Sequence, residues 1–154
     1  MKAIVIYDSV SAVKMTAKVA GFITEGLKAG GVEVASMPVQ DAKNIDLGGY
    51  DCLVLGSPTM AWKPTKDVKD FLGSLSGKKF TGKKAASFDT QLKSAVSGNA
   101  NKALEDGLTD LGFTIACPHL QAYVKGKKDA YVFHDGEQEK AVSWGKDLAA
   151  ALKK

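Results

Sequence analysis

The chain has 154 residues, of which 45% are hydrophobic, 25% charged and 8% aromatic. This length and composition predict one globular domain, residues 1–154, that buries an apolar core without disulfides or metal ions. Its apolar runs are far shorter than the roughly 20 residues that cross a bilayer, and Lys2 and Asp8 charge the N-terminal stretch too early for a signal peptide. We therefore expect a cytoplasmic protein with no membrane partner.

The net charge and the two cysteines exclude further classes. The formal net charge is +4, but all 21 basic residues are lysine, so the bidentate guanidinium contacts that dominate base reading are absent and no nucleic-acid partner is expected. Cys52 and Cys117 lie in apolar stretches and form no C-x-x-C pair, which indicates buried, reduced thiols. His119 and His134 complete no zinc-ligand spacing with them, so no metal site is predicted.

Short apolar, β-branched runs alternate along the chain with stretches of helical periodicity. The runs predict strands at residues 2–7, 32–37, 51–56, 84–88 and 113–117. The periodic stretches predict helices at residues 15–28, 64–75, 100–111 and 138–152. This alternation predicts an α/β fold with a doubly wound five-stranded parallel sheet, for which we expect the strand order 2-1-3-4-5.

Ligands of such sheets bind beyond the carboxyl ends of the strands, near the switch between strands one and three. Function should therefore lie in the connections that follow Tyr7, Gly56 and Phe88, called here the first, second and third loops. No G-x-G-x-x-G follows the first strand and no G-x-x-x-x-G-K-[ST] is present, which argues against dinucleotide-binding folds and P-loop NTPases.

The first loop, residues 8–14, gathers hydroxyls at the start of a helix. Ser9 and Ser11, with the free N–H groups and dipole of the helix, favour a bound anion. The alternative interpretation is that Ser9 or Ser11 only caps the helix.

The second and third loops add an aromatic ring and polar groups at the same edge. Trp62 lies between Pro58 and Pro64, where an exposed ring favours a flat or apolar ligand; alternatively the ring packs onto its own helix. Asp89 begins the third loop, residues 89–94, and is either a site carboxylate or a turn former. Together the three loops describe a site for a flat heterocycle with a terminal monophosphate.

Residues 4–9, 53–59, 87–92 and 143–146 carry a resemblance to the flavodoxins, the small FMN-binding electron carriers, which extends from Met1 to about Leu152. The resemblance implies a flavodoxin-like fold and FMN as cofactor. The family's phosphate loop, T/S-x-T/S-G-x-T, falls on Ser9, Ser11, Ala12 and Lys14. Ala12 replaces the glycine and Lys14 the final hydroxyl.

The resemblance implies three groups of cofactor-binding residues and no catalytic side chain. Trp62 or Met60 would lie against a ring face, and residues 89–92 would meet the pyrimidine edge. The implied cofactor-binding residues are Ser9, Val10, Ser11, Ala12, Val13 and Lys14 in the first loop, Ser57, Pro58, Thr59, Met60, Ala61 and Trp62 in the second, and Asp89, Thr90, Gln91 and Leu92 in the third.

The resemblance further implies a carrier that shuttles one or two electrons between redox proteins. Because the chain is net basic, with Lys14 and Lys63 beside the expected site, we expect a less negative potential for the fully reduced flavin and partners with an acidic docking surface. Two alternatives stay open: an FMN-dependent NAD(P)H:quinone-type reductase, and a flavodoxin-like domain that has lost FMN and serves as a binding module.

Overall fold

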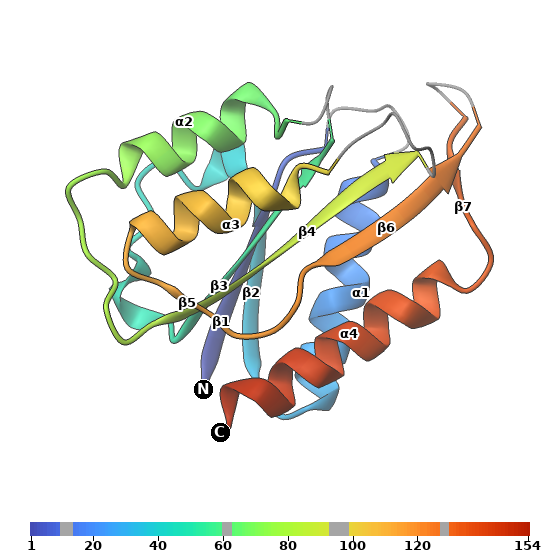
Figure 1. The fold of residues 1–154 in the computed structure, drawn as a ribbon. Coiled ribbons are helices and arrows are strands. Elements are labelled where there is room, and N and C mark those ends of the chain that lie inside the picture. Colours follow the sequence, from blue (N-terminus) through green and yellow to red (C-terminus); the bar gives the residue numbers. More distant parts are fainter. Residues whose placement is uncertain (10–13, 60–62, 93–98, 127–129) are drawn as a thin grey trace.

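A computed structural model describes residues 1–9, 14–59, 63–92, 99–126 and 130–154, in which helices cover both faces of one sheet (Figure 1). The strands are β1 (Lys2–Tyr7), β2 (Glu33–Pro38), β3 (Cys52–Pro58), β4 (Lys84–Leu92), β5 (Thr114–Ile115), β6 (Leu120–Lys125) and β7 (Val132–Phe133). The helices are α1 (Met15–Ala29), α2 (Lys66–Ser74), α3 (Asn101–Asp110) and α4 (Glu137–Leu152), with 3-10 turns η1 (Val39–Asp41) and η2 (Leu47–Gly49).

The sheet has the order β2-β1-β3-β4-β6-β7, and β5 also pairs with β4. All pairs are parallel except β6 with β7. The predicted doubly wound sheet and its order are confirmed, with the fifth position filled by two segments. None of the described helices is both long and apolar enough to cross a membrane.

The fifth strand is interrupted because the chain from Ile115 to Leu120 has more residues than the part of β4 beside which it lies. Ile115 pairs with Ala85 and Leu120 with Phe88, so five steps along one strand match three along β4. Pro118, which has no N–H to donate, lies in this bulge. The predicted strand 113–117 therefore ends at Ile115, and the sequence analysis did not anticipate β6 or β7.

The strand that was predicted to end at Phe88 continues to Leu92, because β6 supplies ladder partners for residues 88–92. Asp89 therefore lies inside β4, and the third loop begins only after Leu92. Helix α2 begins at Lys66 rather than at Pro64, with Thr65 in the capping position. The predicted helix 100–111 is shorter by one residue at each end.

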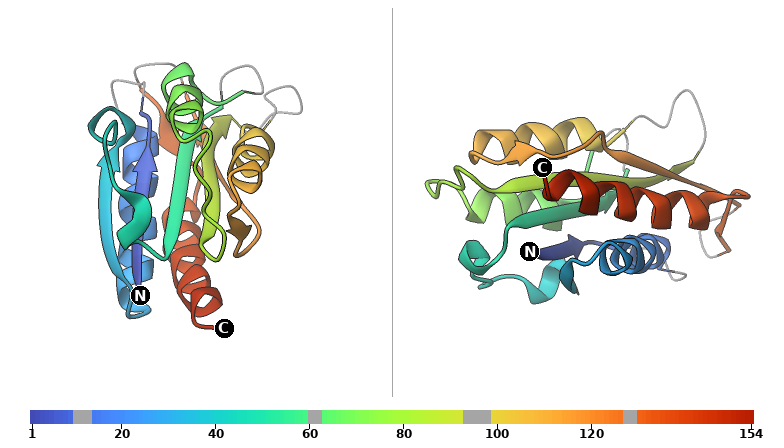
Figure 2. Two further views of the ribbon diagram at one scale, coloured as in Figure 1. Left: turned by 90° about the vertical axis from the view of Figure 1, so that its left-hand side faces the viewer. Right: turned by 90° about the horizontal axis from the view of Figure 1, so that it is seen from below.

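Buried side chains alternate between the two faces of the sheet, as a doubly wound fold requires. Val5 packs toward α1 and α4, whereas its neighbours Ile4 and Ile6 pack toward α2 and α3. The chain termini lie at the end of the sheet opposite to the carboxyl ends of its parallel strands (Figure 2).

Of the two cysteines, Cys52 is buried, as predicted, and Cys117 is half-buried; both are free thiols. Burial raises the pKa of Cys52 to about 12 and that of Cys117 to about 11. Both are therefore protonated at neutral pH, and the less nucleophilic thiol form prevails.

Helices α1 and α4 approach closely because a glycine on each meets the other helix. A Cβ added at Gly26 would lie 2.1 Å from the carbonyl oxygen of Val142, and one added at Gly145 would lie 2.5 Å from that of Ile23. No side chain fits at either position without moving the helices apart. The helix propensity that each glycine gives up is offset by this close packing.

We expect Gly26→Ala to lower the free energy of unfolding by roughly 1–3 kcal/mol, because the new methyl group would overpack the α1–α4 contact. Gly21→Ala in the same helix is the matched control, since nothing lies within 4 Å of a Cβ added there. This variant should gain roughly 0.5–1 kcal/mol from helix propensity. Urea unfolding monitored by circular dichroism checks both, and equal shifts in the two variants would contradict the packing explanation.

Candidate functional site

The strand ends from which the three loops start lie at one edge, because β1, β3 and β4 are parallel neighbours in register (Figure 1). Tyr7 pairs with Gly56, and Pro58 pairs with Thr90, so the expected site residues of all three strands share this edge. All sixteen expected cofactor-binding residues stay predictions. Seven of them lie outside the described parts of the chain: Val10, Ser11, Ala12, Val13, Met60, Ala61 and Trp62.

At the first loop, a hydroxyl and an ammonium group lie at the N-terminus of α1. The Oγ of Ser9 accepts the N–H of Ala17, in the first turn of α1, at 3.3 Å, so Ser9 contributes to capping the helix, although Lys14 holds the N-cap position. Lys14 has φ 53° and is the one non-glycine residue with positive φ in the described chain, while its Nζ donates to the Ser9 carbonyl at 3.4 Å. A left-handed conformation costs a residue with a Cβ about 1 kcal/mol or more, and such strain is concentrated at functional sites. The helix end, the hydroxyl and the ammonium group together suit an anion.

The carboxylate of Asp8 ties the end of β1 to the start of α2. It is only 4% exposed, and its Oδ2 accepts the hydroxyl of Thr65 at 2.7 Å. Its Oδ1 accepts Nε2 of Gln40 at 3.0 Å. Both oxygens therefore have donors within the protein, and Asp8 acts as an internal anchor of the first and second loops.

Ser57 closes the two ends of the second loop onto each other. Its buried hydroxyl donates to the carbonyl of Pro58 at 2.8 Å and accepts the N–H of Thr65 at 3.0 Å. This expected cofactor-binding residue therefore uses its hydroxyl within the loop. Gly56, just before it, leaves room for the buried ring of Phe88, to which an added Cβ would come within 2.0 Å.

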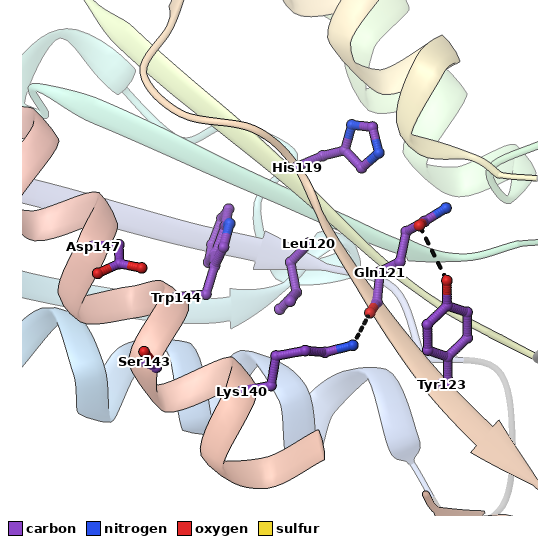
Figure 3. A pocket seen from close by; sticks show the side chains of 8 residues that line it. All are labelled: His119, Leu120, Gln121, Tyr123, Lys140, Ser143, Trp144 and Asp147. Carbon is purple, nitrogen blue, oxygen red and sulfur yellow. Dashed lines mark hydrogen bonds between the residues drawn. The ribbon is translucent and has the colours of Figure 1, made fainter. Parts of the chain in front are cut away.

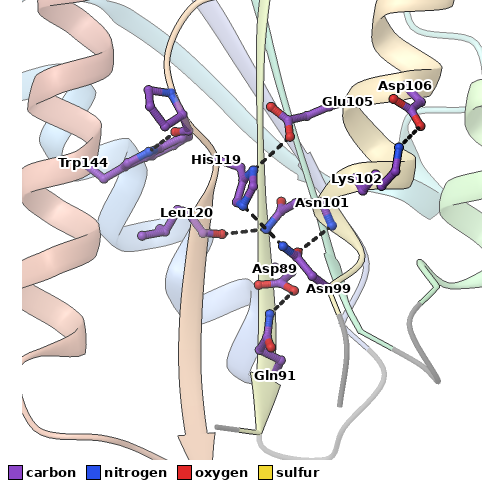
Figure 4. Close-up of polar contacts among 11 residues, drawn as sticks. Asp89, Gln91, Asn99, Asn101, Lys102, Glu105, Asp106, His119, Leu120 and Trp144 are labelled. Atoms are coloured by element: carbon purple, nitrogen blue, oxygen red, sulfur yellow. Dashed lines mark hydrogen bonds and ion pairs between the residues drawn. The ribbon is translucent and has the colours of Figure 1, made fainter. Parts of the chain in front are cut away.

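The carboxyl group of Asp89 joins the second loop to the start of α3, and Figure 4 shows its bond to Gln91. Asp89 is fully buried, and its Oδ2 accepts the hydroxyl of Thr59 and Nε2 of Gln91, both at 2.6 Å. The Thr59 hydroxyl in turn accepts the N–H of Ala100 at 3.0 Å. The Oδ1 of Asp89 has no partner among the described residues. Burial raises the pKa of Asp89 to about 6, although the bonds from Thr59 and Gln91 oppose this shift.

Thr90 links β4 to both other loops, which completes the connection of the three. Its hydroxyl shares a 2.8 Å hydrogen bond with the hydroxyl of Thr16 in the first turn of α1, and its carbonyl accepts the N–H of Thr59 at 3.0 Å. Leu92, at the end of β4, is 42% exposed and offers an apolar side chain at the same edge.

A second polar cluster fixes the start of α3 beside Asp89, and the sequence analysis missed it (Figure 4). Asn99 accepts the N–H of Asn101 at 2.9 Å, and Asn101 donates to the carbonyl of Leu120 at 3.1 Å. His119 lies 3.3 Å from Asn99 and 2.8 Å from Glu105. The signal in the sequence is Asn99 just before the expected helix, because an asparagine that accepts the N–H two residues on forms an Asx turn.

A shallow cavity of about 410 Å³ lies elsewhere, between β6 and α4 (Figure 3). Here side chains of α4 form hydrogen bonds with the backbone of β6. Lys140 Nζ donates to the Gln121 carbonyl at 2.8 Å, and a Glu137 carboxylate oxygen accepts the N–H of Tyr123 at 2.9 Å. The Trp144 indole N–H donates to Pro118 at 2.9 Å. The side chains of Lys140 and Glu137 bond to backbone groups of β6 before Val124, where its pairing with the short strand β7 begins, so we interpret this cavity as structural.

The buried carboxyl of Asp89 makes stability depend on pH in a direction that can be measured. Because its pKa is about 6 in the folded protein and 3.8 ordinarily, the stability it contributes is present below pH 4 and is lost as pH rises through 6. Asp89→Asn keeps an oxygen for Thr59 and Gln91 but removes the charge. Relative to the native chain, this variant should gain roughly 3 kcal/mol between pH 4 and pH 7 in urea unfolding. A constant difference across this range would contradict the assignment.

Solved structures match the chain over nearly its whole length. Flavodoxin 1 from Bacillus cereus has a TM-score of 0.80 and 23% identity, with 97% of this chain and 98% of that chain covered. A flavodoxin from the domain Archaea has a TM-score of 0.81 and 25% identity, with both chains fully covered. The flavodiiron core from Synechocystis has a TM-score of 0.77 and 23% identity over 99% of this chain and 36% of its own. No protein-family model and no curated protein sequence matches the chain.

Proposed function

We propose that the three joined loops of this flavodoxin-like fold bind FMN and that the protein carries one or two electrons between redox proteins. The arrangement of the carboxyl edge of the sheet supports this most directly. The N-terminus of α1, with Ser9 beside it, suits a phosphate, and buried hydrogen bonds to Asp8 and Asp89 fix the second loop next to it. Bound FMN supplies the redox chemistry, and the protein sets its binding and potential.

The described residues fit the two ends of this cofactor. Ser9, Lys14 and the first turn of α1 would hold the dianionic phosphate, since the ammonium group and the helix end both favour negative charge. Thr59 and Leu92 would contact the ring, since both lie at the carboxyl edge of the sheet and Leu92 is partly exposed. Asp89 has no exposed surface, so it supports the ring site from behind.

Reconstitution of the purified protein with excess FMN tests the proposal. After unbound FMN is removed, the absorbance spectrum should show the visible bands of oxidised flavin. A colourless protein would contradict the proposal and favour the domain that has lost FMN. Steady oxidation of NADH or NADPH by the yellow protein would instead favour the reductase.

Binding of riboflavin, which lacks the phosphate, separates the two ends of the site. Lys14→Gln, which removes the charge without adding a β-branched side chain at positive φ, should weaken FMN binding about ten-fold, the loss of roughly 1.4 kcal/mol of a charge-assisted contact, and leave riboflavin binding unchanged. The control is Lys18→Gln, at an exposed position of α1. If Lys14→Gln and Lys18→Gln bind FMN equally, Lys14 does not contact the phosphate.

The charge at this edge supports a partner with an acidic docking surface. Lys14, Lys63 and Lys125 are exposed after the carboxyl ends of β1, β3 and β6. Asp67, bonded to Gln40, is an exposed carboxylate near them, while the carboxylates of Asp8 and Asp89 are buried and hydrogen-bonded. An excess of exposed charge of one sign steers oppositely charged partners toward the site and does so less at high salt.

Small oxidants of opposite charge test this surface. Reoxidation of the reduced flavoprotein by anionic ferricyanide should slow as salt rises, and reoxidation by cationic hexaamminecobalt(III) should accelerate. Lys63→Glu should slow the ferricyanide reaction several-fold at low salt only. Lys28→Glu, at the far end of α1, is the control. Equal effects of the two variants would contradict a basic docking edge.

A further inference from the structure

Asp89 is an unusual group to bury at the proposed site. Its side chain has no solvent exposure, it lies between the second loop and the start of α3, and one of its carboxyl oxygens has no partner among the described residues. An apolar or amide side chain would avoid the cost of burying a carboxylate there. The group therefore calls for a role other than stability.

We propose that ionised Asp89 is the positioning residue of the ring site: it holds the second loop against the start of α3, and its protonation weakens binding of the flavin ring. This inference rests on the proposed FMN-binding function.

A chain of two hydrogen bonds that ends on the Asp89 carboxylate holds the second loop against the start of α3. The N–H of Ala100 donates to the Thr59 hydroxyl, and that hydroxyl donates to Asp89 Oδ2 at 2.6 Å. A hydroxyl that donates to a negative charge forms a strong bond and becomes a better acceptor for the next donor in the chain. Thr59 immediately precedes Met60, Ala61 and Trp62, the expected ring contacts, so the carboxylate fixes the start of that segment.

Protonation of Asp89 weakens this chain of hydrogen bonds at the carboxyl group on which it ends. The unpartnered Oδ1 is the oxygen that can take the proton, which leaves Oδ2 as a neutral and weaker acceptor for Thr59 and Gln91. Burial raises the pKa of Asp89 to about 6, so the change falls in a range that a folded protein tolerates. Because the side chain is already fully buried, the ring adds little desolvation, and the effect acts through the hydrogen bonds.

One other titratable group of the described chain faces Asp89. His119, just before β6, lowers the pKa of Asp89 through its charge and is itself hydrogen-bonded to Glu105. The other groups placed against Asp89 do not titrate in this range. Ser57 of β3 and Gln121 of β6 pair with it in the sheet, Thr59 and Gln91 donate to its carboxylate, and the N–H of Ala100 at the start of α3 lies beside it. His119→Gln is therefore the necessary control.

Riboflavin is the probe, because FMN carries a phosphate that itself titrates near pH 6. Its dissociation constant, measured by fluorescence quenching, should rise about ten-fold in the native chain as pH falls from 7.5 to 5. Asp89→Asn should bind riboflavin weakly at every pH. His119→Gln should keep a pH dependence whose midpoint moves to higher pH, because it removes the charge that lowers the pKa of Asp89. Thr59→Val should behave like Asp89→Asn, whereas Thr59→Ser should restore the pH dependence.

The flavin-free protein gives a second readout. The amide proton of Ala100, followed by NMR, should titrate with a midpoint near pH 6 in the native chain and not in Asp89→Asn. An Ala100 signal that does not titrate, or riboflavin binding that is tight and independent of pH, would overturn the inference and leave the FMN site standing. Absence of riboflavin and FMN binding at every pH would overturn both.

Discussion

Two buried carboxylates, each of which accepts a threonine hydroxyl, fix the loops at the carboxyl edge of the sheet. Asp8 at the end of β1 accepts Thr65, and Asp89 in β4 accepts Thr59, so the two ends of the β3–α2 connection are attached to the strands on either side of β3. A buried charge is tolerated only when it is hydrogen-bonded, and breaking such a group from its partner is strongly destabilising. The connection is therefore fixed at the points where it leaves and re-enters the core.

The same hydrogen bonds distinguish two kinds of residue at this edge: buried residues that support the loops, and exposed residues that would contact a ligand. Ser57, Asp8 and Asp89 are buried and bonded within the protein. Lys14 and Leu92 remain exposed toward solvent at the ends of the proposed site. Rigid elements thus carry the loops, and a supporting layer of hydrogen bonds sets their geometry. The raised pKa of Asp89 shows that this arrangement is maintained against a cost in stability at neutral pH.

Much of the fold was predictable because its signals are local. Apolar runs such as the one in β1 read as buried parallel strands, and their alternation with helices fixed the topology. The interrupted fifth strand was not predictable, since it depends on how residues 116–119 bulge against β4. Asp89 was expected in a loop because polar residues after an apolar strand indicate a turn. Burial and the β6 ladder reverse that interpretation.

The site was predictable in its place and less so in its parts. The carboxyl edge and the phosphate-type first loop follow from the topology and from Ser9, although Ser9 also caps α1. The pairing of Thr59 with Asp89 and of Thr65 with Asp8 joins residues 30 and 57 positions apart, and no periodicity records it. Likewise, only the structure explains the glycine at position 56, because the ring of Phe88 occupies the space that a side chain would need.

The most direct test of this account is the amide NMR spectrum of the protein as FMN is added. The account predicts that the largest shifts fall at the carboxyl edge, on Met15 and Thr16 at the start of α1, on Thr59, and on Ala100. Shifts centred on Trp144 and Lys140 at the cavity beside β6, or no shifts at all, would contradict it.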